Sequence, residues 1–202
     1  MEQVERAAPV RRSWWRTKTF AAGAVAVGVI ALLAVLGPVV APDYVSFDIM
    51  LIDPERGVPL GDLGGISGDH WFGVEPLMGR DLFARVVHAM QLSLRVALVA
   101  AVAEVVLGLL VALVVRRGKV RGQLRPALMW LALLVPVNLL VEVWFAYTGR
   151  SLLEPPTPSW GAMLSDATVW FDLDPAFLLI PGLLLVATVF AFLLLGLGMR
   201  ER

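Results

Sequence analysis

Four long stretches of the chain are almost wholly apolar, and the segments between them hold nearly all of the charge. The stretches are residues 20–42, 96–115, 126–148 and 175–199, which together contain 91 residues and two charged side chains. A helix of about 20–25 residues rises roughly 30–37 Å, which matches a hydrocarbon core about 30 Å thick. The pattern therefore predicts an all-α membrane protein with four transmembrane helices.

Lys and Arg are unevenly divided between the two sides of these spans. With four spans both termini share one side, and residues 1–19, 116–125 and 200–202 then carry 12 Lys and Arg in 32 residues. The opposite segments, 43–95 and 149–174, carry 5 in 79 residues. Because cytoplasmic segments are enriched in Lys and Arg, we predict a cytoplasmic basic arm, connector and tail, with both termini cytoplasmic and two external loops.

The first apolar run has a second interpretation, as a cleavable signal peptide. Basic residues between positions 11 and 18 precede it, and Val39-Val-Ala41 lies at its end. A signal peptide has an apolar region of about 7–15 residues, and this run is longer. We therefore expect the segment to stay in the protein as the first span.

The two external loops differ in pattern. Residues 43–78 are rich in Gly, Pro and Asp, which is typical of irregular loops. From Gly79 onward the spacing is helical, with one apolar stripe and one polar stripe, which predicts an amphipathic helix at the membrane interface that leads into the second span. The apolar stripe contains Leu82, Val86, Met90 and Leu94, and the polar stripe contains Asp81, Arg85, His88 and Arg95. Residues 149–174 hold Pro155-Pro156-Thr157-Pro158 and are predicted to form a second loop.

Composition narrows the possible functions. The chain is 58% hydrophobic, with a mean hydropathy of +0.78, no cysteine, two histidines and a net charge of zero. These values argue against a disulfide-bonded secreted domain, a soluble metalloenzyme and a nucleic-acid binder. Ser93 and His88 have no positioned third group that would make a catalytic site. We therefore expect neither an enzyme, nor a bound cofactor or metal.

Three polar residues lie within the predicted spans: Glu104 in the second, and Asn138 and Glu142 in the third. Polar groups at membrane depth are costly and are functional candidates by default. They can line a polar path, or they can join helices through interhelical hydrogen bonds. Both interpretations stay open from the sequence.

The external loops carry a family resemblance. The stretch from His70 through Gly73, Gly79, Arg80 and Asp81 to Arg85 resembles the segment before the second span in permease subunits of dipeptide, oligopeptide and nickel ABC importers. The stretch Pro155-Pro156-Thr-Pro158-Ser-Trp160 resembles the last periplasmic loop of the same family. The resemblance implies a multi-pass protein of the bacterial cytoplasmic membrane. It also implies that the residues named in these two stretches are candidate contacts for a periplasmic partner.

The chain departs from that family in its middle. Two spans and the cytoplasmic loop that docks onto the ATPase are missing, and a basic connector joins the second and third spans instead. Its candidate cytoplasmic contacts are Arg116, Arg117, Lys119, Arg121 and Arg125. In the family ATP is bound by a separate ATPase subunit, and the departure puts ATPase contact by this chain in doubt.

The resemblance implies a permease-like transmembrane subunit of a peptide-type import system, which forms part of the substrate path with a second permease subunit. A periplasmic substrate-binding protein is a further candidate partner. The alternative is a non-transporting membrane interaction or regulatory protein derived from such a permease. The connector favours this alternative, because a basic segment suits anionic lipid headgroups.

Overall fold

The computed structural model describes residue 15 and residues 17–115, 122–151 and 157–200. Within this part of the chain the helices are α1 (Lys18–Val40), the short 3-10 helix η2 (Ile49–Leu51), α2 (Leu82–Val115), α3 (Leu124–Tyr147), α4 (Trp160–Trp170) and α5 (Pro175–Arg200). Four of them, α1, α2, α3 and α5, are long and apolar enough to cross a membrane. The predicted all-helical membrane protein with four spans is confirmed.

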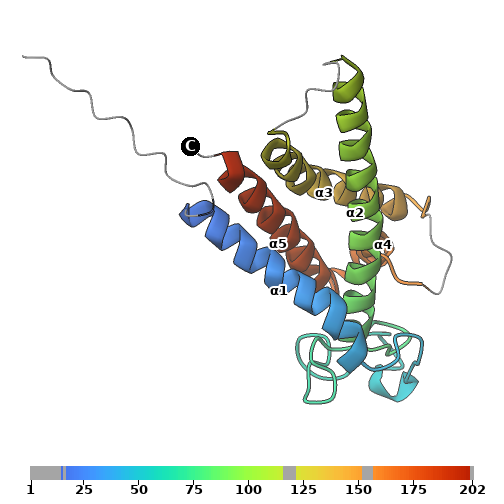
Figure 1. Ribbon diagram of the computed structural model, residues 1–202. Coiled ribbons are helices and arrows are strands. Elements are labelled where there is room, and N and C mark those ends of the chain that lie inside the picture. The colour runs from blue at the N-terminus through green and yellow to red at the C-terminus, as the bar shows by residue number, and fades with distance from the viewer. Residues whose placement is uncertain (1–14, 16, 116–121, 152–156, 201–202) are drawn as a thin grey trace, which may run out of the picture.

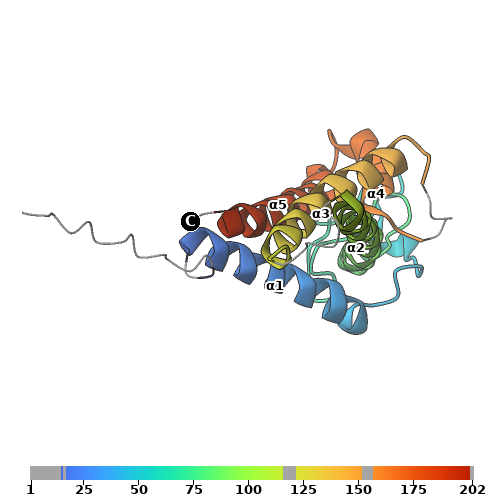
Figure 2. The ribbon, with the colours of Figure 1, turned by 45° about the horizontal axis from the view of Figure 1, so that its top comes forward.

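Helices α1 and α5 lie side by side along their lengths (Figures 1 and 2). Glycines make this close contact possible, since a Cβ atom at Gly23 would collide with the backbone of Leu195, and one at Gly198 with the backbone of Phe20. Small residues let the backbones of membrane helices approach in this way. The Thr17 hydroxyl also donates to the Gly198 carbonyl at 3.4 Å.

Hydrogen bonds connect the starts of α1 and α3 to the end of α5, at one end of the bundle. Thr17 precedes α1 and bonds the end of α5, while the Arg125 guanidinium at the start of α3 donates through Nε to the Met199 carbonyl at 3.0 Å. The loop between α1 and α2 lies at the opposite end (Figure 1). The described residues Thr17, Arg125 and Arg200, which belong to or border the basic segments, therefore lie at the same end of the bundle. Which side of the membrane that end faces stays a prediction.

Helix α2 is one continuous helix that includes the predicted amphipathic segment. The Asp81 carboxylate starts it by accepting the Ala84 N–H at 2.7 Å. The helix has 34 residues, so it rises about 51 Å and extends well beyond the hydrocarbon core. The first turns of α2 do not form the predicted interfacial helix with one exposed face. The first loop and helix α4 cover both stripes, so that Val86 of the apolar stripe and Arg85 of the polar stripe are both buried.

The two loops also differ from each other. Residues 42–81 are irregular apart from η2 and two isolated β-bridges, Ile52 with Pro59 and Val74 with Asp81. The second loop contains helix α4, which the sequence analysis missed. This helix begins directly after Ser159, whose side chain accepts the Ala162 N–H at 3.3 Å. The helix begins two residues after the last proline, and the proline-rich stretch predicted a loop there.

The core lies where α1, α2, α3 and α5 meet, and a smaller cluster lies between α2, α4 and α5. The first contains Ile30, Met90, Val135, Leu139, Trp160 and Leu185, and the second contains Leu82, Val86, Met163, Ala167 and Phe177. Beyond Ala101 the packing changes, because α2 has exposed apolar side chains up to its end. Figure 1 shows this part of α2 standing clear of α1 and α5.

Candidate functional site

A polar pair joins α2 and α3 near the middle of both spans. The Asn138 amide donates to Glu104 Oε2 at 3.0 Å and also to the carbonyl of Leu134, one turn earlier, at 3.2 Å. Glu104 is exposed in this chain. A charged side chain at this depth costs about 2.5–3.5 kcal/mol on insertion scales, so an exposed carboxylate here indicates a surface that meets something other than lipid.

Beside this pair lies a groove of about 340 Å³ between the C-terminal half of α2 and the N-terminal half of α3. Its α2 wall is made by Glu104, Val105, Gly108, Leu109 and Ala112, and its α3 wall by Gln123, Pro126, Ala127, Trp130 and Leu134. A Cβ atom at Gly108 would meet no other atom within 4 Å. The groove is thus apolar and open, with a carboxylate at one end.

Glu142 occupies a separate position. It is buried in α3, and Ser93 of α2 lies beside it. The Ser93 hydroxyl in turn accepts the N–H of Trp160 at 3.5 Å. Glu142 therefore lies where three helices meet, whereas Glu104 lines the groove and its partner Asn138 is half-buried.

An ionic cluster fastens the first loop to α2. Glu75 accepts from Arg80 Nε at 2.8 Å, and its Oε2 lies 3.0 Å from Arg85 Nε. Asp166 of α4 lies near both arginines, and burial raises its pKa, with the Glu75 carboxylate adding to the effect. Glu75 and Arg85 are both buried, so these charges stabilise the attachment of the loop to α2.

The residues named from the family resemblance mostly hold the loop together. His70 Nδ1 lies 2.9 Å from Asp81 Oδ2. A Cβ atom at Gly73 would collide with the Gly64 carbonyl, and one at Gly79 with the Asp48 carbonyl. These glycines also have positive φ angles of 79° and 63°, a region that favours glycine.

Burial limits which of these residues a partner can touch. The side chains of Asp81, Arg85, Pro158 and Trp160 are buried inside the chain, while His70 and Arg80 are partly exposed. Partner contact stays a prediction for this last pair. Pro155 and Pro156 lie outside the described residues.

The predicted cytoplasmic contacts are described only in part. Arg116, Arg117, Lys119 and Arg121 lie outside the described residues. Arg125 binds the last turn of α5 through its guanidinium, where a cation is favourable to the helix dipole.

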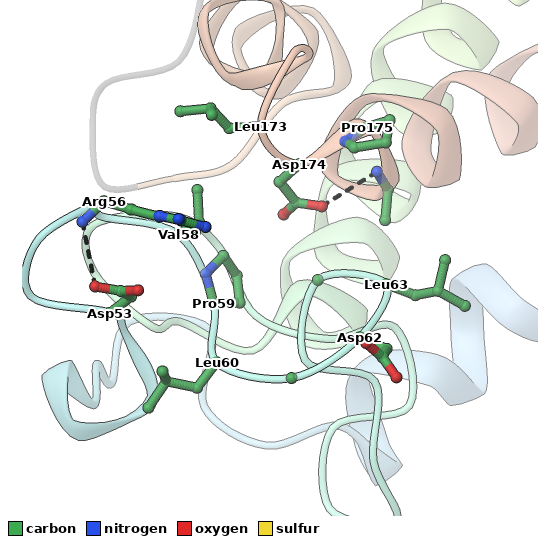
Figure 3. Close-up of a pocket in the computed structure, with 13 residues that line it drawn as sticks. Asp53, Arg56, Val58, Pro59, Leu60, Asp62, Leu63, Leu173, Asp174 and Pro175 are labelled. Carbon is green, nitrogen blue, oxygen red and sulfur yellow. Dashed lines mark hydrogen bonds between the residues drawn. The ribbon is translucent and has the colours of Figure 1, made fainter.

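A second cavity, of about 430 Å³, lies between the first loop and the start of α5 (Figure 3). Arg56 and Asp174 come from different walls of it. Asp174 is buried, its Oδ1 accepts the Ala176 N–H at 3.2 Å, and its Oδ2 has no partner among the described residues. Burial raises the pKa of Asp174, against the opposing effect of its backbone hydrogen bonds. In the described part of the chain no three His, Asp or Glu side chains are placed to hold a metal ion.

Comparison with known proteins shows which proteins this chain is similar to. The chain is 36% identical over 118 residues to the oligopeptide transport system permease protein OppC of Salmonella typhimurium, over 58% of this chain and 38% of that protein. OppC of Escherichia coli strain K12 is 36% identical over 88 residues, covering 44% and 29%. By sequence, this chain is a relative of peptide-transport permeases.

A further relative is the glutathione transport system permease protein GsiD of Escherichia coli O1:K1 / APEC, 46% identical over 48 residues, which cover 24% of this chain and 16% of that protein. No protein-family model matches. The matched segment with OppC of Salmonella spans less than two-fifths of that protein's length. Together with the four candidate spans, these similarities support a multi-pass protein of the cytoplasmic membrane that is similar to permease subunits.

Proposed function

We propose that this chain is a transmembrane subunit of a peptide-type ABC import system. In this proposal the groove between α2 and α3 forms part of the substrate path, and a partner permease subunit closes it. The mid-span hydrogen bond between the exposed Glu104 and the half-buried Asn138 is the observation that carries the proposal. An intramembrane carboxylate that faces an open groove suits a polar path or a subunit interface, and one chain alone leaves the groove open.

The orientation follows from charge. Thr17 meets Gly198 and Arg125 meets Met199 at one end of the bundle. These residues border or belong to the basic parts of the sequence, and segments rich in Lys and Arg stay in the cytoplasm. We place the loop 42–81 and helix α4 on the periplasmic side. A periplasmic binding protein would meet this surface, where His70 and Arg80 are partly exposed.

This chain has little sequence that could couple it to ATP hydrolysis. A subunit is driven between states only by contacts that differ between those states, and the sequence between α2 and α3 is short and basic. We propose that a partner subunit supplies most of the ATPase contact and that this chain binds no ATP itself.

Peptide uptake by cells tests the proposal. In the organism that encodes the chain, its deletion should lower uptake of radiolabelled trialanine at least tenfold, and the unchanged chain should restore it. Glu104→Leu combined with Asn138→Leu should fail to restore uptake although membrane levels on immunoblots are normal. The matched control Val99→Leu changes an exposed α2 residue away from the groove and should restore uptake fully.

The same assay decides the second candidate function, a membrane interaction protein without transport activity. The basic connector favours this role, because five cations without an acid suit anionic headgroups. Unchanged uptake of trialanine in the deletion strain, with the chain still recovered in membranes, would contradict the transport proposal and support this one.

A further inference from the structure

The cavity of about 430 Å³ between the first loop and the start of α5 shares no lining residue with the α2–α3 groove. Its charged lining residues are Asp53, Asp62, Asp174 and Arg56, so it holds more negative than positive charge. Asp174 is only 5% exposed, and its Oδ2 has no hydrogen-bond partner among the described residues. We propose that this cavity binds the headgroup of a phospholipid with a primary ammonium group, such as phosphatidylethanolamine. This site stands independently of the proposed function.

The two oxygens of the Asp174 carboxylate have different surroundings. Oδ1 accepts the Ala176 N–H at 3.2 Å, at the start of α5, as a residue that caps a helix does. Capping therefore accounts for one oxygen only. A buried carboxylate oxygen without a donor is costly, and an N–H group that enters the cavity removes this cost. Figure 3 shows the carboxylate between the start of α5 and the first loop.

Arg56 supplies the opposite charge in the same cavity. Its backbone N–H donates to Asp53 Oδ1 at 3.2 Å, which fixes the turn that carries it. Its side chain is exposed and belongs to none of the ion pairs within the described part of the chain. A guanidinium suits a phosphate, and a carboxylate suits an ammonium. A headgroup with a phosphate next to an ammonium matches this pair of charges.

The position of the cavity favours a lipid over a free ligand. It adjoins the start of α5, one of the helices long and apolar enough to cross a membrane. Ala176 lines the cavity, and Leu179 and Leu183 follow it by three and seven residues, on the same face of α5. These leucines are 49% and 65% exposed. An acyl chain can therefore lie along this apolar stripe while its headgroup occupies the cavity.

The unpartnered oxygen predicts which headgroups bind. Choline has the same phosphate and the same positive charge as ethanolamine, but its nitrogen carries three methyl groups and no N–H. The natural chain should therefore bind dioleoylphosphatidylethanolamine at least about tenfold more tightly than dioleoylphosphatidylcholine, as expected for one hydrogen bond to a charged group. The N-monomethyl and N-dimethyl forms keep an N–H group and should bind like phosphatidylethanolamine.

Native mass spectrometry of the purified full chain in detergent, titrated with each lipid, measures these affinities. Asp174→Asn keeps an oxygen for the helix cap but loses the charge and the second acceptor, so it should bind the two lipids equally. The matched control Asp172→Asn changes an exposed residue and should keep the selectivity. Arg56→Gln should weaken both lipids by a similar factor, because both carry the phosphate. Circular dichroism confirms that each variant is folded.

Equal affinity of the natural chain for the two lipids would overturn the inference, and this comparison requires no variant. Selectivity that survives Asp174→Asn would overturn it as well. Free O-phosphoethanolamine separates a lipid from a soluble ligand with the same headgroup. In about tenfold molar excess it should displace little of the bound lipid, because it lacks the acyl chains that the stripe on α5 contacts. Full displacement would contradict a lipid occupant.

Discussion

Exchange of Gly23 for alanine should separate α1 from α5, while the same exchange at Gly28 should not. A Cβ atom at Gly23 would overlap the backbone nitrogen and Cα of Leu195, whereas one at Gly28 would meet nothing within 4 Å. Both glycines belong to α1, so the chemical change and the helix are the same. The two variants differ in what the added methyl group meets.

The expected magnitude follows from the atoms that are struck. Inserting a methyl group into a packed region typically costs about 1–3 kcal/mol. Backbone atoms of Leu195 cannot rotate away, so the helix itself must move, and we expect the upper part of that range, about 2–3 kcal/mol. This corresponds to about a 30- to 150-fold change in the equilibrium constant for unfolding. Gly28→Ala should be neutral or stabilise by up to about 1 kcal/mol through helix propensity.

Titration of detergent micelles with sodium dodecyl sulfate measures both variants, since the seven tryptophans report unfolding by fluorescence. Gly23→Ala should unfold at a clearly lower fraction of dodecyl sulfate than the natural chain. Equal midpoints for the two variants would refute the close contact of α1 and α5.

Three further substitutions test the ends and loops of the fold. Because burial raises the pKa of Asp174, the folded state favours its protonated form, and this contribution to stability is lost as pH rises through the folded pKa. Asp174→Asn should therefore raise the unfolding midpoint at pH 8 and not at pH 4, whereas Asn at the exposed Asp172 should change neither. Arg125→Gln removes a charged hydrogen bond to the last turn of α5 and should cost about 1.5–3 kcal/mol in the same titration. Glu75→Gln leaves two arginines without their buried counter-charge and should cost about 3–5 kcal/mol with faster trypsin cleavage of the first loop, while Glu55→Gln on the exposed loop surface should leave cleavage unchanged.

The spans could be predicted because one property, apolar length, determines them. The predicted segments 20–42, 126–148 and 175–199 differ by at most two residues from the ends of α1, α3 and α5. Helix α4 was not predicted because a signal for a loop and a signal for a helix start lie within a few residues of each other. The prolines up to Pro158 dominate the composition of that loop, while the helix depends on the cap that Ser159 provides.

The helices that hold the polar residues could be predicted, but the partners of these residues could not. Asn138 and Glu142 are four residues apart on α3 and would be grouped on one face by spacing alone. In the structure Asn138 meets Glu104 and Glu142 meets Ser93. The two partners on α2 are eleven residues apart, so this pairing depends on the direction and crossing of the two helices. Periodicity along a single helix carries no information on either.

The residues that carry the family resemblance and the residues that carry the proposed path are different sets, and this affects how function should be tested. Gly73 and Gly79 permit close backbone contacts, and Asp81 starts α2. Substitution of any of these would unfold the loop, and the loss of uptake that follows would say nothing about transport. Glu104 lies on an exposed face where a variant can fold normally. Only variants of the groove residues can therefore lose transport while the protein stays folded. If Glu104→Leu abolishes uptake and Glu104→Gln retains it, the function lies in the groove.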